Sequence, residues 1–254
     1  MNKTMRRKRT KRKRKNLART RLALILIVTF ALLSTGFQIY RQIQIRKVLA
    51  KLPVELQTLY QKNPEARKFV LNYEKNVGID HPVDLNKELR SGDVPLLMQW
   101  DERWGYHTYA GNLLGLTGCG PTCLSMVATH LTGNGELNPK WIADFSQENG
   151  FATEESGSSW TLISEGAPLL GIEAIEIAPD EMRMAENIQV GNPIICVLGP
   201  GDFTDEGHFI VLTGYDQNGF TIKDPNRAAN SKKTWPFETL RKQMLNLWVM
   251  RKSD

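Results

Sequence analysis

Hydrophobic and polar positions divide the chain into one apolar stretch near its start and a longer part of mixed pattern. Residues 22–40 carry no charge and consist mostly of Leu, Ile, Val, Ala and Phe. A helix rises about 1.5 Å per residue, so this stretch matches the roughly 30 Å hydrocarbon thickness of a bilayer. The pattern predicts a transmembrane helix, with a cleaved secretory signal or a buried core helix as the alternatives.

Residues 41–93 are more polar. The Asn-Pro-Glu sequence at residues 63–65 is typical of a helix start, because Asn can cap, Pro suits the first turn and Glu favours the N-terminal dipole. Phe69, Val70 and Tyr73 then recur at helical spacing. We expect a helical stalk or lead-in that packs on the domain after it, rather than one that binds a partner independently.

The remainder shows helical patterns first and strand patterns afterwards. Caps, glycines and apolar periodicity predict helices at 121–131, 139–150, about 159–171 and 181–190. Alternating or continuous apolar runs predict strands at 172–178, 193–198, 209–215, 220–223 and 247–250. Trp235 indicates a further strand, followed by a short helix at 237–245. Helices followed by an antiparallel sheet are typical of an α+β fold.

Charge is concentrated at the N-terminus. The net charge is +6, but residues 1–21 hold twelve of the 33 Lys and Arg residues and no acid, which leaves 21 basic against 27 acidic residues elsewhere. The excess of cations before the apolar stretch places the N-terminus in the cytoplasm and residues 41–254 outside. We expect the basic tail to orient the helix and attract anionic lipid, and we expect no nucleic-acid binding.

Cys119 lies between two glycines, directly before a helical pattern. The thiolate is the nucleophilic form of cysteine, and the free N–H groups of a helix N-terminus stabilise it. The glycines also let a substrate approach. We therefore interpret Cys119 as a nucleophile, with an inert buried thiol as the alternative. Cys123 and Cys196 are interpreted as buried residues, with a resolving thiol as the alternative for Cys123, and no disulfide scaffold, metal site or other cofactor is expected.

His208 begins a strand pattern after a glycine-rich loop, where a catalytic base is commonly presented, with a structural histidine as the alternative. Asp224 follows on the other arm of a predicted hairpin. Side chains alternate between the faces of a sheet, so the two residues share a face only if the loop around residues 216–219 is odd, for example a turn with a glycine bulge. If it is, Asp224 can orient His208; otherwise Asp224 belongs to an ordinary polar turn.

Two blocks of sequence resemble the papain-like peptidases of family C39 and their stand-alone relatives. The first block contains Gln99-Trp100-Asp101, Gly118-Cys119-Gly120-Pro121-Thr122 and Met126-Val127. The second contains Gly207-His208-Phe209-Ile210-Val211-Leu212-Thr213-Gly214-Tyr215 and Asp224-Pro225. The resemblance covers about residues 94–251 and implies a papain-like α+β fold. It also implies a catalytic triad of Cys119, His208 and Asp224.

One departure concerns the oxyanion hole. The bacteriocin-processing members of the family place a Gln six residues before the nucleophile, where this chain has Leu113. Gln99 lies 20 residues before Cys119, across a glycine-rich insertion, and is the candidate to fold back to that place. Those members also adjoin an ABC transporter, and this chain shows no ATPase motif, so leader-peptide cleavage during export does not follow.

The sequence therefore predicts a basic cytoplasmic tail (1–21), a transmembrane helix (22–40), a stalk or lead-in (41–93) and a papain-like domain (94–254). We expect a monomeric, membrane-anchored cysteine peptidase on the surface of a Gram-positive-type bacterium, acting on a peptide or protein. Two alternatives remain open. One is a surface module with an idle triad that binds peptide or glycan, and the other is a cell-wall amidase or transferase.

Overall fold

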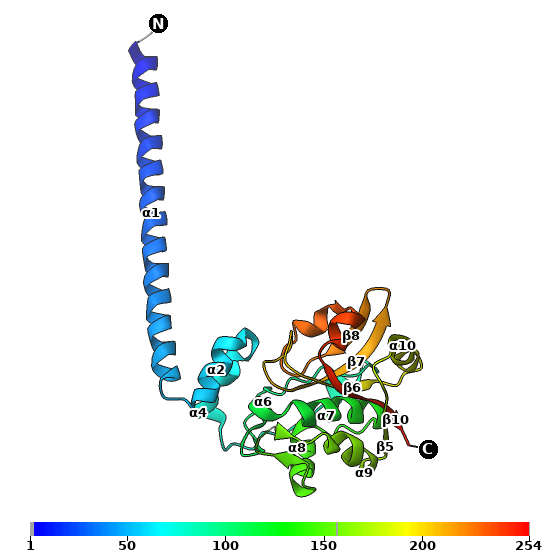
Figure 1. Ribbon diagram of the computed structural model, residues 1–254. Helices are drawn as coiled ribbons and strands as arrows, with labels where there is room; N and C mark the ends of the chain where they lie inside the picture. The colour runs from blue at the N-terminus through cyan, green and yellow to red at the C-terminus, as the bar shows by residue number, and fades with distance from the viewer. Residues whose placement is uncertain (1–2, 156, 254) are drawn as a thin grey trace. The chain divides into compact units, whose positions relative to one another are not determined.

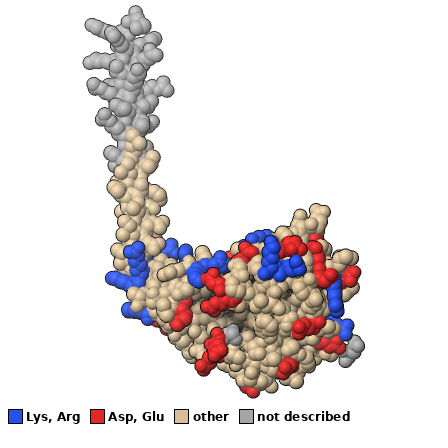
Figure 2. Space-filling view, in the orientation of Figure 1, with Lys and Arg blue, Asp and Glu red and all other residues tan. Residues whose placement is uncertain are grey.

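The computed structural model describes residues 3–155 and 157–253, with the backbone alone described at residues 3–23 and 25. The chain divides into two units, Met1–Pro53 and Val54–Asp254. The first unit contains the long helix α1 (Lys3–Leu49). Lys and Arg side chains, drawn in blue, lie near the end of this helix after an uncharged stretch (Figure 2).

Within the part of the chain whose side chains are described, no helix is both long enough and apolar enough to cross a membrane. The side chains of the expected basic tail, residues 1–21, lie outside that part, as do those of residues 22, 23 and 25 of the expected span.

The second unit begins with short helices. Their bounds are α2 (Val54–Lys62), η1 (Pro64–Ala66), α3 (Arg67–Leu71), α4 (Tyr73–Asn76) and α5 (Asn86–Leu89). Asn63 caps η1 as expected, because its Oδ1 accepts the N–H of Glu65 at 3.0 Å. Leu56, Phe69 and Val70 are almost completely buried. Residues 54–93 therefore pack into the same compact unit as the residues that follow.

The sheet of this unit has six strands, all antiparallel, in the order β5-β10-β6-β7-β8-β9. Their bounds are β5 (Ile172–Glu176), β6 (Ile194–Leu198), β7 (His208–Asp216), β8 (Gly219–Lys223), β9 (Thr234–Trp235) and β10 (Met244–Lys252). Two short hairpins accompany it: β1 (Thr108–Tyr109) with β2 (Asn112–Leu113), and β3 (Ala152–Thr153) with β4 (Gly157–Ser158).

Helices cover both faces of the sheet. Their bounds are α6 (Leu114–Thr117), α7 (Cys119–Thr132), α8 (Pro139–Glu148), η2 (Leu162–Gly166), α9 (Ala167–Leu169), α10 (Glu181–Gln189), η3 (Asn230–Lys232) and α11 (Phe237–Arg241). Helices α7, α8 and α9 gather along one side of the sheet (Figure 1). This arrangement confirms the α+β class and the C-terminal antiparallel sheet expected from the sequence.

Alternate residues of the central strands enter two hydrophobic cores. On β6, Ile195 and Val197 join the core that contains most of α7, whereas Ile194 and Cys196 join the core that contains residues of α10 and α11. A strand that is buried on both faces reads as a continuous apolar run, which is why this strand could be predicted. Burial of each such side chain contributes about 1.5–3 kcal/mol.

The β7–β8 hairpin corrects one expectation. Asp216 pairs with Gly219, so the turn contains two residues and the loop is not odd. The carboxylate of Asp216 closes this tight turn by accepting the N–H of Asn218 at 2.7 Å. Gly219 has a different role from the expected bulge, because an added Cβ would lie 2.1 Å from the carbonyl oxygen of Trp235 on β9.

The extra residue lies within β7 itself. Leu212 pairs with Ile222 and Gly214 pairs with Thr221, which leaves Thr213 as a bulge. Continuing the register below the bulge places Asp224 opposite Ile210, whose side chain is on the same face as that of His208. The bulge therefore provides the odd residue that the two side chains need in order to meet.

Candidate active site

Cys119 is the first residue of α7, and no side chain caps the N-terminus of this helix. Both flanking glycines are required by close packing. An added Cβ would lie 2.4 Å from the carbonyl oxygen of Leu114 at position 118, and 2.5 Å from Oγ of Ser158 at position 120. The helix start is therefore wedged between these neighbours, which fixes the position of Cys119.

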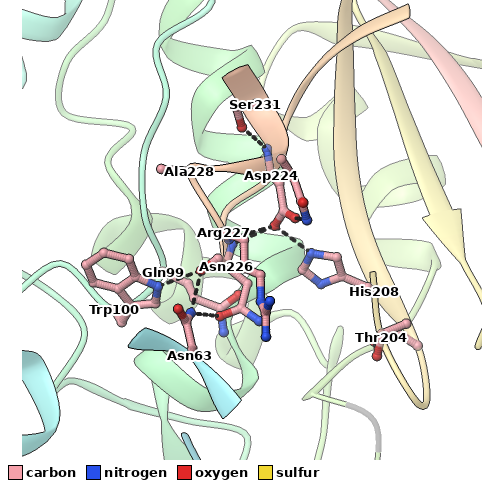
Figure 3. A network of polar contacts seen from close by, with 12 residues as sticks. Asn63, Gln99, Trp100, Thr204, His208, Asp224, Asn226, Arg227, Ala228 and Ser231 are labelled. Atoms are coloured by element: carbon pink, nitrogen blue, oxygen red, sulfur yellow. Dashed lines mark hydrogen bonds and ion pairs between the residues drawn. The ribbon is translucent and has the colours of Figure 1, made fainter. Parts of the chain in front are cut away.

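His208 and Asp224 meet as the register requires. His208 begins β7 and Asp224 directly follows β8, and both side chains are buried. Nε2 of His208 lies 2.9 Å from Oδ1 of Asp224 (Figure 3). The imidazole also lies close enough to Cys119 to lower the pKa of its thiol, and both residues line one cavity. Since Nε2 contacts Asp224, Nδ1 is the nitrogen of His208 that is left to interact with the thiol.

These contacts determine the charges of the three groups. Burial by itself raises the pKa of Cys119, but the His208 imidazole and backbone hydrogen bonds from Phe209 and Gly120 hold it below its usual value. Burial lowers the pKa of His208, whereas hydrogen bonds to Asp224 and Cys119 raise it to about 10. Burial raises the pKa of Asp224, and its hydrogen bonds outweigh that effect and lower it. Thiolate, imidazolium and carboxylate thus stabilise one another.

Asp224 is held by its own turn. Its Oδ1 accepts the backbone N–H groups of Asn226 and Arg227 at 2.8 and 3.1 Å, and its Oδ2 accepts Nδ2 of Asn230 at 2.7 Å. The backbone N–H of Asp224 donates to Oγ of Ser231 at 2.9 Å. Sequence analysis missed Asn230 and Ser231. The Asp-Pro-Asn sequence indicated a turn, but it gave no signal for the two later contacts.

Gln99 is buried and folds back toward the segment before Cys119. Its Nε2 donates to the carbonyl oxygens of Gly115 and Leu116 at 3.2 and 3.3 Å, which uses both amide hydrogens. Its Oε1 is buried and has no hydrogen-bond partner among the described residues. To stabilise an oxyanion the amide would have to turn, so this role of Gln99 stays a prediction.

Cys119 and His208 line a cavity of about 440 Å³, within the usual range of about 300–1,000 Å³ for ligand pockets. The other residues that line it are Thr153, Ser158, Ser159, Trp160, Val197, Gly207 and Phe209. Trp160 is 43% exposed and packs edge-on against Trp248, with ring centroids 6.5 Å apart. The thiol therefore lies at the wall of a cavity of the size that binds small ligands.

A buried hydroxyl network to which the sequence analysis gave no role lies behind this cavity. The hydroxyl of Tyr109 is 2.7 Å from Oγ of Ser158 and 3.0 Å from Oγ of Ser146. Burial raises the pKa of Tyr109 to about 12, so the hydroxyl keeps its proton at neutral pH. The network ties the β3–β4 hairpin, which lines the cavity, to α8.

The remaining cysteines are buried, as interpreted from the sequence. Cys123 and Cys196 are both fully inaccessible, and burial raises the pKa of each thiol. Among the described residues, no cluster of His, Cys, Asp or Glu side chains is arranged to hold a metal ion. His107 is instead paired with Asp144 at 2.6 Å, away from the cavity.

Comparison with solved structures returns peptidase domains. The peptidase domain of Streptococcus ComA, a bifunctional ABC transporter involved in quorum sensing, is 22% identical over 54% of this chain and 93% of that chain, with a TM-score of 0.43. A protein from Bacillus anthracis described as a C39-like peptidase is 15% identical over 64% and 97%, with a TM-score of 0.42. The double glycine motif protease of an AMS/PCAT transporter, solved with its leader peptide, is 19% identical over 64% and 94%, with a TM-score of 0.39.

No curated protein matches the chain. The model of one protein family, described as the Peptidase_C39 like family, matches residues 91–253. This match spans more than half of the sequence and includes Cys119, His208 and Asp224. The chain therefore belongs to the Peptidase_C39 like family.

Proposed function

We propose that this protein is a cysteine peptidase whose catalytic triad is Cys119, His208 and Asp224. The observation that carries the proposal is that Cys119 and His208 line one cavity, with Asp224 2.9 Å from the imidazole and the pKa of the thiol lowered by that imidazole. An idle binding module would have no need of a thiol with a lowered pKa that faces the cavity. Membership of a peptidase family supports the same reaction class.

The reaction follows from the positions of the three groups. The thiolate of Cys119 attacks the carbonyl carbon of a peptide bond, and the imidazolium of His208 protonates the amine as the C–N bond breaks. The resulting thioester is attacked by water, whose proton passes to His208, and the acid product leaves as the C–S bond breaks. Asp224 holds the imidazole in place and stabilises its positive charge. Backbone N–H groups at the start of α7, with Gln99 after rotation of its amide, are the candidates for binding the oxyanion.

The proposal includes a location outside the cytoplasmic membrane. It rests on the sequence pattern alone, with a basic tail at residues 1–21 and an uncharged apolar stretch at residues 22–40. Membrane fractions should retain the full chain after a carbonate or high-salt wash and release it with detergent. Release by the wash alone would contradict the anchor, and mass measurement of the mature chain would reveal a cleaved signal.

The enzyme proposal is tested with the full chain and its Cys119→Ala variant. A peptide library and purified peptidoglycan serve as substrates, and E-64 and iodoacetamide serve as thiol probes. We expect hydrolysis of peptides that is lost in Cys119→Ala and retained in a matched Cys196→Ala control. Hydrolysis of peptidoglycan alone would instead favour the cell-wall amidase. Labelling of Cys119 no faster than that of a free thiol, with no hydrolysis, would favour the binding module.

A further inference from the structure

The turn that carries Asp224 is held by a segment that precedes the family match. Asn63, just before η1, donates Nδ2 to the carbonyl oxygen of Asn226 at 2.7 Å and to Oδ1 of the same residue at 3.0 Å. Asn63 is 2% exposed, so these bonds are shielded from water. Figure 3 shows Asn63 beside Asn226, at the end of the turn away from His208.

Glu65 holds the next part of the same turn. Its two carboxylate oxygens accept the backbone N–H groups of Ala228 and Ala229 at 2.7 and 3.0 Å. Hydrogen bonds to an ionised acceptor are roughly twice as strong as those between neutral groups. Glu65 thus acts as an anionic clamp on a turn that lies more than 160 residues later in the sequence.

A third contact from this segment carries less weight. The guanidinium of Arg227 donates to the carbonyl oxygen of Lys62, and the ammonium of Lys62 pairs with Asp205 in the loop before His208. Both members of the Lys62–Asp205 pair are mostly exposed, and exposed ion pairs contribute little. The buried contacts of Asn63 and the two bonds of Glu65 therefore dominate.

The backbone of the turn contacts the triad directly. The N–H groups of Asn226 and Arg227 donate to the carboxylate of Asp224. The first belongs to the residue that Asn63 holds, and the second lies between that residue and Ala228, which Glu65 holds.

From inside the family match, Trp100 donates to the Asn226 carbonyl and the Gln99 N–H donates to the Pro225 carbonyl, both at 2.8 Å. After residue 226, the N–H groups of Asn230 and Ser231 in η3 donate to the carbonyl oxygens of Arg227 and Ala228 at 3.0 and 3.1 Å. The carbonyl oxygens after residue 226 are thus held by η3, whereas the N–H groups of Ala228 and Ala229 are held by Glu65 of the lead-in.

We propose that Asn63 and Glu65 are positioning residues that set the place of Asp224 against His208. The segment before the family match, which begins at residue 91, is then a working part of the active site. This inference rests on the triad proposed above. It separates a function of the lead-in from simple packing, because it assigns an effect on the reaction to residues that touch neither the cavity nor the reacting groups.

The test compares the full chain with its Glu65→Ala and Asn63→Ser variants. Ser keeps an acceptor for capping η1 but is too short to reach Asn226. The readouts are kcat and KM for a peptide substrate and the rate of Cys119 alkylation by iodoacetamide, each measured against pH. The charged or titratable groups that face His208 are Asp224 and Cys119. A displaced Asp224 should therefore move the alkaline limb of both profiles to lower pH and the acid limb to higher pH.

We expect kcat to fall about tenfold in Glu65→Ala, with KM changed less than about twofold, because bonds to a charged group are lost and substrate contacts are kept. Glu65→Gln, which keeps one acceptor oxygen, should lie between Glu65→Ala and the unaltered chain. The matched control is Lys68→Ala, which removes only an exposed lead-in contact with Glu102. Its profile should coincide with that of the unaltered chain.

The outcomes separate this inference from the proposed function. A lower Tm with unchanged kcat and unchanged pH limbs in both variants would show that the contacts only stabilise the fold, and would overturn the inference. Equal losses in Lys68→Ala would do the same. If the unaltered chain itself alkylates at Cys119 like an ordinary thiol, the triad proposal fails first, whatever the variants do.

Discussion

Asn230 donates its side-chain amide to Oδ2 of Asp224 at 2.7 Å, and so occupies the carboxylate oxygen that His208 leaves free. This bond keeps the carboxylate from rotating about its χ2 angle. Hydrogen bonds to a charged group contribute about 1.5–3 kcal/mol, so Asn230→Ala should lower kcat/KM by about tenfold or more. Steady-state kinetics check this, with Asn218→Ala in the exposed β7–β8 turn as the control. Equal effects of the two substitutions would exclude a specific role for Asn230.

The pH dependence of activity follows from the two coupled groups. The active form needs a deprotonated Cys119 and a protonated His208. The pKa of Cys119 is lowered and that of His208 is raised to about 10, so this form exists from below the usual thiol pKa up to about pH 10. We expect kcat/KM to reach its plateau at a lower pH than an ordinary thiol would allow, to fall on the acid side of that plateau as Cys119 gains a proton, and to fall near pH 10 as His208 loses one.

Asp224→Asn should move the alkaline limb of this profile to lower pH. The amide keeps the shape of the side chain but removes the charge that raises the pKa of His208. The acid limb should move to higher pH, because a less cationic imidazole stabilises the Cys119 thiolate less. A profile whose alkaline limb is the same in the variant would show that another group sets it. Asp144→Asn, at a carboxylate that contacts His107 and does not line the cavity, is the matched control.

If the bulge at Thr213 aligns the triad, deleting it should abolish peptidase activity and a compensating insertion should restore it. Deleting Thr213 would make the β7–β8 hairpin regular and turn His208 and Asp224 to opposite faces, so activity should be lost. Inserting one glycine between Gln217 and Asn218 in the same chain would restore the odd count through the turn, and activity should return. Far-ultraviolet circular dichroism and a peptidase assay check both chains. Activity in the deletion alone would refute the role of the bulge.

Local signals explain what the sequence predicted well. Gly133 ends α7 in the left-handed conformation with φ of 71°, and Asn138 caps α8 by accepting the N–H of Trp141. Each of these depends on residues within one turn of helix, which the sequence displays directly. The position of Cys119 at the start of α7 followed from the same kind of signal.

Long-range contacts explain what the sequence could not predict. Gly214 follows the bulge at Thr213, and an isolated glycine in a strand can mark a bulge, but which residue stays unpaired depends on the pairing of two strands. The clamp of Glu65 on Ala228 joins residues 163 apart, and Glu65 fits equally well as an ordinary acid in a first helical turn. Nothing in a single sequence distinguishes an ordinary acid in a first helical turn from an acid that holds a distant turn.

Substitution of two glycines with similar backbone conformation should lower the free energy of unfolding by different amounts. Gly157 in the β3–β4 hairpin has φ of 76°, and an added Cβ would lie 2.6 Å from the carbonyl oxygen of Thr117. Gly133 has φ of 71° and nothing within 4 Å. Gly133→Ala should therefore cost only the left-handed conformation, about 1 kcal/mol, whereas Gly157→Ala should cost more than about 2 kcal/mol and displace Ser158 at the cavity. Urea unfolding measures both costs. Equal changes in the free energy of unfolding would mean that the β3–β4 hairpin moves to accept the added Cβ, and that the cavity wall beside Cys119 is not rigid.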